Sequence, residues 1–289
     1  MGVSPTIKII NDPIKDADAF VSFIWHKYFI QNREKILKTY PELTDIINSS
    51  DAEKKVRDFV VSLHQSKGNQ LEEIIKYNQE IINKKNNAAF KFLSGFMNYS
   101  WSDPIAYNAY LSLLPFSPFK KDYFFYSVLA ELNNKNPENK SVLSTAIHEI
   151  SHIIFLEYIE KMGWKIGQNV SKDVVYVLQE SITSSMFKNP ELLSLFNMPK
   201  SPRGNPEIVE IHISEGDNNM TLVDFVDKNI IFNKNNNNDM NQIINKLIKL
   251  FASIGDQISK KIEMWHKFGY KTLRDQELLK KFRQPIVIE

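Results

Sequence analysis

The sequence predicts an α+β fold that is predominantly helical, with a small sheet placed before a long buried helix. Apolar residues recur at helical spacing through most of the 289 residues. Two short runs, Ala106–Leu114 and Tyr123–Val128, are instead rich in aromatic and other strand-forming residues. From Val142 to Ile159 the chain is apolar nearly all round, which is typical of a helix that is buried on every side.

The composition is that of an ordinary globular protein. Hydrophobic residues make up 43%, charged residues 24%, and the formal net charge is +2. This balance gives no indication of binding to nucleic acid or to a charged membrane surface. No uninterrupted apolar run reaches the roughly 18 to 20 residues of a membrane span, and the first residues lack the pattern of a secretory signal. We therefore expect a cytoplasmic protein without a membrane span.

The N-terminal part is expected to be helical after one short β-like run at Ile7–Ile10. Asp12 and Pro13 predict the start of a helix, and helical spacing continues from there to about Lys38. Two further helical blocks follow: Leu43–Gln65 and Leu71–Phe92.

Towards the C-terminus the pattern is weaker. Ile208–Ile213 alternates as a strand does, and Asn233–Asn238 is a polar low-complexity tract that predicts an exposed loop. Asp239 predicts the start of a long helix that continues to Trp265. A last helix is expected near Leu273–Phe282.

The strongest chemical pattern lies inside the apolar helix, where His148 and His152 stand four residues apart. On an α-helix this spacing puts both imidazoles on one face, about one turn apart, so both can reach a single metal ion. Glu149 points about 100° around the helix from His148, so its carboxylate lies beside the metal, where it can accept a proton from water. The helix is expected to begin at Asn136–Glu138 and to end at Gly163.

These residues resemble the His-Glu-x-x-His motif of the zincin-type zinc metallopeptidases. The longer zincin pattern also requires Thr or Val three residues before the first His, uncharged residues at the two variable positions and apolar residues after the second His. The chain meets each requirement: Thr145, Ile150, Ser151, Ile153 and Ile154. The resemblance covers about fifty residues, Asn139–Met186. It implies Zn2+ as cofactor, a peptide or protein as substrate, and Glu149 as general base. Since the chain has no cysteine, the metal ligands must be nitrogen and oxygen atoms.

A catalytic zinc usually has three protein ligands and one open position. Phe155 and Tyr158 stand where the metzincin class needs Gly and His, so the resemblance points to the gluzincin class, in which a Glu on a following helix completes the site. Glu180, an acidic residue inside an apolar helical run, is the candidate. Gln179 departs from the pattern, because gluzincins usually have Asn there. Three other acidic residues are candidates: Asp173, and Glu157 and Glu160, which lie on the same helix as the histidines but are turned away from His152 or too far along the axis to share its ion.

The resemblance further implies a zincin-like catalytic domain with a small sheet before the active-site helix, and one of the two strand-like runs as the edge that pairs with an extended peptide. We expect one catalytic unit over residues 1–289, made of an N-terminal helical part (1–95), a zincin core that holds both ligand helices (96–190) and a C-terminal helical part (191–289). A further side chain should stabilise the oxyanion. Four residues could supply it: His212, His266, Tyr270 and Tyr176.

Two alternatives use the same residues. One is a metal-dependent hydrolase of a non-peptide amide or ester, which would depend on Glu149 without cleaving peptides. The other is a catalytically inert binding protein that keeps the zincin scaffold for structure. The activity of such a protein would survive a Glu149→Gln substitution.

Overall fold

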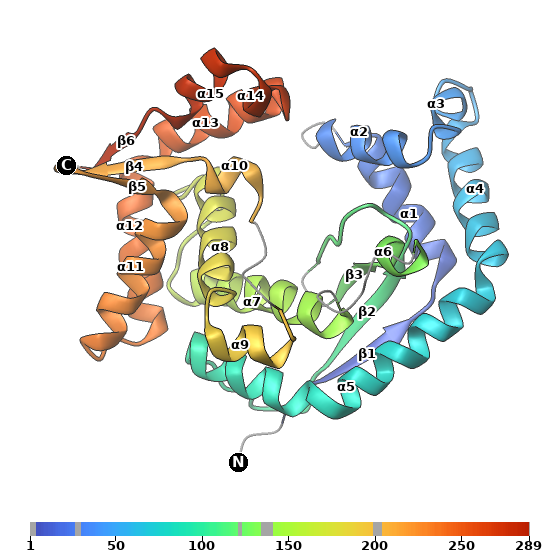
Figure 1. The fold of residues 1–289 in the computed structure, drawn as a ribbon, viewed down its shortest axis with the longest axis horizontal. Coiled ribbons are helices and arrows are strands. Elements are labelled where there is room, and N and C mark those ends of the chain that lie inside the picture. The colour runs from blue at the N-terminus through green and yellow to red at the C-terminus, as the bar shows by residue number, and fades with distance from the viewer. Residues whose placement is uncertain (1–3, 27–29, 121–122, 134–140, 199–203, 289) are drawn as a thin grey trace. The chain divides into compact units, whose positions relative to one another are not determined.

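A computed structural model describes residues 4–26, 30–120, 123–133, 141–198 and 204–288. The fold is α+β and predominantly helical, as the sequence predicts (Figure 1). The chain divides into two compact units, one made of Met1–Lys91 and Trp101–Glu149, the other of Phe92–Ser100 and Ile150–Glu289. Two continuous helices, α5 (Gly68–Met97) and α7 (Val142–Lys161), cross this division.

The first unit holds a three-stranded parallel sheet in the order β1-β2-β3. The strands are β1 (Thr6–Ile10), β2 (Ala106–Ser112) and β3 (Tyr123–Ser127), so all three strand predictions in this part of the chain are confirmed. α5 lies beside the sheet (Figure 1): Asn86 Nδ2 donates to the Pro5 carbonyl at 2.8 Å, and the Phe90 ring stacks on Tyr107 with 6.2 Å between centroids.

The outer edge of β3 is covered by the segment that precedes it. Phe125 N–H donates to the Pro118 carbonyl, and Lys120 N–H donates to the Tyr123 carbonyl, each at 2.8 Å. Ser127 N–H donates to Ser117 Oγ at 3.0 Å. Of the two runs expected to offer an edge to a substrate peptide, β2 is central in the sheet. The outer edge of β3 already has these backbone groups engaged.

The helices of the first unit follow the predicted pattern with two breaks, one after Ile24 and one after Ile46, where the block expected at Leu43–Gln65 divides into two helices. Asp12 caps α1 (Pro13–Ile24) by accepting from the N–H groups of Ile14 and Lys15, as predicted. The expectation of one helix as far as Lys38 is wrong, because α1 closes at Ile24 and His26 N–H bonds the carbonyl three residues back. The other helices here are α2 (Ile30–Thr39), α3 (Leu43–Ile46), α4 (Ala52–Ser66) and α6 (Leu129–Leu132).

A buried hydrogen-bonded cluster joins α1, α4 and the end of β2. Asp16 and His64 are both buried, and His64 Nε2 lies 2.9 Å from Asp16 Oδ2 while His64 Nδ1 lies 3.0 Å from Asn11 Oδ1. The carboxylate of Asp16 also accepts from the hydroxyl of Ser112 and from Leu113 N–H. The carboxylate thus ties α1 and α4 to the carboxyl end of the central strand.

The second unit has its own three-stranded sheet in the order β5-β4-β6. β4 (His212–Glu215) and β5 (Asn218–Thr221) form an antiparallel hairpin, and β6 (Ile286–Ile288) lies parallel to β4. The strand expected at Ile208–Ile213 therefore begins later. Its first residues belong to a short helix, α10 (Pro206–Val209), because Pro206 stands at the first helical position.

The long helix predicted from Asp239 starts where its cap predicts, but it breaks at a position that the apolar spacing does not reveal. Asp239 and Gln242 form the capping box of α12 (Met240–Ser253). The helix expected to reach Trp265 is interrupted, because Ile254 leaves the helical conformation and Gly255 starts α13 (Gly255–Phe268). Asp275 likewise splits the last predicted helix. The remaining helices are α8 (Lys172–Met186), α9 (Pro190–Leu195), α11 (Leu222–Asn235), α14 (Lys271–Arg274) and α15 (Gln276–Arg283).

The asparagine tract is only partly a loop. Asn233 lies in the last turn of α11 and is buried. Its Oδ1 accepts from Lys246 Nζ at 2.9 Å and from Asn238 Nδ2 at 3.1 Å. The expectation of an exposed loop is therefore wrong at the start of the tract, where the amide anchors α11 to α12.

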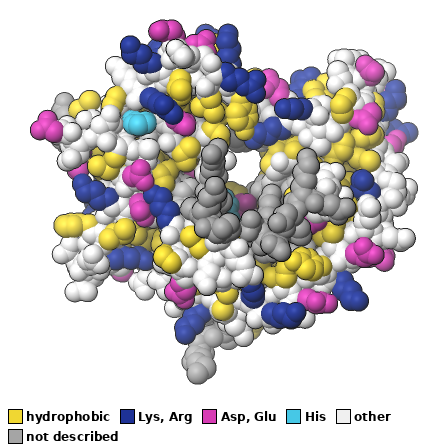
Figure 2. Space-filling view, in the orientation of Figure 1, with side chains coloured by type: hydrophobic (Ala, Val, Ile, Leu, Met, Phe, Trp, Pro, Cys, Tyr) yellow, Lys and Arg dark blue, Asp and Glu magenta, His cyan; other side chains and the backbone are white. Residues whose placement is uncertain are grey.

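Charged side chains of both signs are interspersed on the face drawn in Figure 2. This distribution agrees with the formal net charge of +2. Among the surface ion pairs is Arg57, whose Nε lies 2.8 Å from the exposed carboxylate of Asp18.

The buried cluster gives a stability prediction. Asp16→Asn should lower the free energy of unfolding by about 3–5 kcal/mol. The substitution removes the buried carboxylate that contacts His64, Ser112 and Leu113 N–H. The measurement is urea denaturation. Asp18→Asn, on the same helix but exposed, is the control and should cost much less. Equal losses in the two variants would contradict the role given to Asp16.

Candidate metal centre

Both motif histidines lie on α7, whose ends are fixed by local hydrogen bonds. At the described start, Ser141 and Ser144 exchange bonds, each N–H donating to the hydroxyl of the other at 3.0 and 3.2 Å. The expected start at Asn136–Glu138 lies outside the described residues. Gly163, at φ 78°, closes the other end as predicted, because its left-handed conformation lets two N–H groups bond back to the last turn.

α7 is buried over most of its length. Among the described residues it is the one helix that is long and apolar enough to cross a membrane by length and composition, but 83% of that apolar window is buried inside the protein, as in a core helix. Ala146, Ile150 and Ile154 are fully buried around the motif. Polar side chains at such positions need partners, because leaving them unpaired there is costly.

Three side chains converge at one point: His148, His152 and Glu180. One ligand atom from each lies within 4.8 Å of the other two, so the group could hold a metal ion. His152 Nε2 is 3.4 Å from Glu180 Oε1. Two atoms that are each about 2.1 Å from a tetrahedral ion are about 3.4 Å apart. The spacing therefore fits two ligands of one ion.

The two helices hold these ligands in different ways. His148 and His152 are one turn apart on the continuous helix α7, so the helix itself sets their spacing. Glu180 comes from α8, which Ser171 caps by accepting from Val174 N–H at 3.1 Å. The ring of His152 is 1% exposed and the side chain of Glu180 13% exposed. The carboxylate is thus the more accessible of these two ligands.

A hydroxyl pair lies behind His152. Thr183 Oγ1 is 3.3 Å from His152 Nδ1 and 2.7 Å from Ser151 Oγ. Ser151 and Thr183 are both buried. Sequence reasoning did not single out Thr183. The available signal was its position three residues after Glu180, which puts it on the same face of α8.

Glu149 follows His148 on α7 and is 6% exposed. The three grouped ligands are His148, His152 and Glu180, so Glu149 is a neighbour of the group on the helix and not a member of it.

The four candidates for oxyanion stabilisation lie in different places. Tyr176 is on α8, one turn before Glu180, and its hydroxyl donates to Glu207 at 2.8 Å. Burial, followed by the charges of Glu207 and Glu180, raises the pKa of Tyr176 well above its usual value, so the phenol stays neutral. The others are His212 on β4, the exposed His266 in α13, and the exposed Tyr270 after it. Tyr176 is therefore the candidate whose titration Glu180 influences.

The alternative third ligands are placed elsewhere. Glu157 accepts from the Tyr99 hydroxyl at 2.8 Å and lies 3.5 Å from Lys161 Nζ. Glu160 is exposed near the end of α7, and Asp173 lies in the first turn of α8. Of the four acidic candidates, Glu180 is the one that the structure brings to the two histidines.

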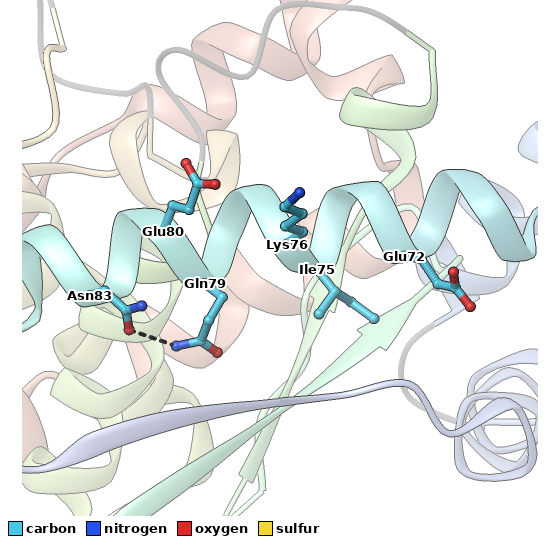
Figure 3. Close-up of a pocket in the computed structure, with 6 residues that line it drawn as sticks. All are labelled: Glu72, Ile75, Lys76, Gln79, Glu80 and Asn83. Atoms are coloured by element: carbon cyan, nitrogen blue, oxygen red, sulfur yellow. Dashed lines mark hydrogen bonds between the residues drawn. The ribbon is translucent and has the colours of Figure 1, made fainter.

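A hollow of about 430 Å³ lies along one face of α5 (Figure 3). None of the residues that line it belongs to the candidate metal centre. A 3.0 Å hydrogen bond from Gln79 to Asn83 joins two of its side chains. A ligand site usually draws converging groups from several elements, whereas this hollow is lined by a single helix. The lining residues are Glu72, Ile75, Lys76, Gln79, Glu80 and Asn83.

Comparison with protein-family models, curated proteins and solved structures gives no match to this chain.

The chemical nature of the ligand atoms limits which metal ions the site could bind. Calcium and magnesium prefer oxygen ligands, whereas two imidazole nitrogens with one carboxylate oxygen suit zinc and its transition-metal neighbours. The side chains at the site fit a transition-metal ion.

We predict that the protein binds one equivalent of a divalent transition metal and that His152→Ala abolishes this binding. At a free metal concentration of about 100 times Kd, the bound metal should stabilise the native protein by about 2.7 kcal/mol. Metal quantification after dialysis and thermal denaturation measure the two effects. His266→Ala, at an exposed position on α13, should bind and respond like the native protein. Full metal occupancy in His152→Ala would place the ion elsewhere.

A matched pair of glutamates tests the third ligand. Glu180→Gln should weaken the metal affinity, because it removes the carboxylate that faces His152 Nε2. Glu157→Gln should leave the affinity unchanged, because that carboxylate bonds Tyr99. Competition with a chromophoric chelator gives both dissociation constants. An unaltered affinity in Glu180→Gln would transfer the third-ligand role to another residue.

Proposed function

We propose that this chain is a zinc-dependent metallopeptidase of the gluzincin type. The observation that carries the proposal is the meeting of His148, His152 and Glu180 within 4.8 Å, with Glu149 next to His148 on the same buried helix. The motif supplies two of these three ligands, and the third, Glu180, comes from a separate helix. The geometry thus adds to the motif the ligand that the gluzincin interpretation requires.

Zinc is the proposed ion because it binds imidazole and carboxylate ligands in a four-coordinate site. Structural zinc sites use four protein ligands, whereas catalytic sites use three and leave a position for water or substrate. The group of described residues offers three ligands. When bound, zinc supplies Lewis-acid chemistry that polarises a carbonyl and makes water more acidic.

Glu149 is proposed as the general base. Its carboxylate accepts a proton from the attacking water while the water oxygen bonds to the peptide carbonyl carbon. The same carboxyl group then gives the proton to the leaving amine as the carbon–nitrogen bond breaks. Its burial, at 6% exposed, limits competing contact with bulk water.

Tyr176 is the preferred oxyanion donor among the four candidates. It lies one turn from Glu180, and its raised pKa keeps the proton that a donor needs. In this role its hydroxyl would exchange its bond to Glu207, and a weaker one from Asn205 at 3.3 Å, for the substrate oxygen.

The substrate is proposed to be a peptide or protein. Binding as an added strand on β3 would require Ser117–Lys120 to give up its hydrogen bonds to that edge. The proposed substrate is therefore not placed on β3.

Glu149→Gln is the decisive test. The variant should retain its metal and lose about 10²–10⁴-fold of peptide cleavage, because a proton acceptor is removed while the ligands stay in place. A proteome-derived peptide library, with metal quantification on the same samples, measures both. Glu160→Gln, at an exposed position of the same helix, is the control and should keep full activity.

Other outcomes would overturn the proposal. Hydrolysis of esters or non-peptide amides that depends on Glu149, without peptide cleavage, would assign a different hydrolase. A binding activity that survives Glu149→Gln, with no hydrolysis of any substrate, would assign an inert scaffold.

A further inference from the structure

We infer that Thr183 is a positioning residue that holds the ring of His152 with its Nε2 atom turned to the metal. The inference rests on the proposed metal centre and extends it to the residue that orients one of its ligands. It concerns metal affinity, which can be measured separately from hydrolysis.

The two nitrogens of His152 face different partners. Nε2 lies 3.4 Å from Glu180 Oε1, on the side of the grouped ligands. Nδ1 lies 3.3 Å from Thr183 Oγ1. A nitrogen that binds a metal carries no proton, so the proton of the neutral ring is on the other nitrogen. His152 Nδ1–H then donates to Thr183 Oγ1, and this bond fixes both the tautomer and the plane of the ring.

The hydroxyl of Thr183 is itself held in place. Because its oxygen accepts from His152, its own proton is available for Ser151 Oγ, which lies 2.7 Å away. His152 and Thr183 are each 1% exposed and Ser151 is 2% exposed. Water does not compete for hydrogen bonds at such positions, and each bond is stronger for it.

A neighbouring serine shows that this arrangement is not the default for a helix. A hydroxyl inside a helix commonly bonds the carbonyl four residues back. Ser181, also buried on α8, does so and donates to the Val177 carbonyl at 2.7 Å. The hydroxyl of Thr183 reaches across to two side chains of α7 instead. α8 thus provides both the carboxylate ligand and the group that orients the histidine facing it.

Two substitutions at one position test the inference. Thr183→Val keeps the shape and removes the hydroxyl, and should raise the dissociation constant for Zn2+ about 10–100-fold. Thr183→Ser keeps the hydroxyl and should restore affinity close to that of the native protein. Chelator competition on the full chain gives the affinities, and the visible spectrum of the Co2+-loaded protein reports the geometry at the ligands. Ser181→Ala removes a buried hydroxyl of the same helix and should change neither readout.

A second variant keeps the test decisive if Thr183→Val does not fold. Ser151→Ala leaves Thr183 in place but removes the partner of its hydroxyl, and should weaken Zn2+ binding in the same direction and by less. Native affinity in Thr183→Val, or in Ser151→Ala when Thr183→Val is unfolded, overturns the positioning role and leaves the proposed function standing. A native protein that binds no Zn2+ overturns the proposed function itself.

Discussion

The burial of α7 is the constraint on which the site depends. A helix packed against apolar neighbours can carry two imidazoles and a carboxylate only if each group finds a partner inside the protein. α8 supplies partners for both nitrogens of His152, with Glu180 on one side and Thr183 on the other. The same contacts between α7 and α8 therefore satisfy both nitrogens of His152 and place atoms that could hold an ion.

Much of this site could be predicted from the sequence because helical periodicity is a local property. The spacing of His148 and His152 fixes their relation wherever the helix lies, and Glu180 stands out as an acid within an apolar run. Thr183 could not be singled out in this way. In the sequence it looks like Ser181, and only the packing of α8 shows that one hydroxyl bonds its own helix while the other bonds α7.

The fold shows the same limit. Apolar spacing predicts the helices and the strands of the first sheet, but it continues unchanged through the ends of α1 and α12, where the backbone conformations of Trp25 and Ile254 stop the helix. The parallel pairing of β1 and β2 joins residues about a hundred positions apart. The covering of β3 by its own preceding segment likewise depends on backbone hydrogen bonds that no side-chain pattern encodes.

Two histidine–carboxylate pairs among the described residues differ in a way that shows why the second one fits a metal. In the first, His64 Nε2 is 2.9 Å from Asp16, an ordinary hydrogen-bond distance, and both oxygens of that carboxylate also accept from Ser112 or Leu113. In the second, His152 Nε2 is 3.4 Å from Glu180, and a ligand atom of His148 lies within 4.8 Å of both. The first pair is closed by direct hydrogen bonds. The second has the wider spacing and the third ligand that an ion between the side chains requires, so similar residue types form a structural cluster in one place and a candidate metal centre in the other.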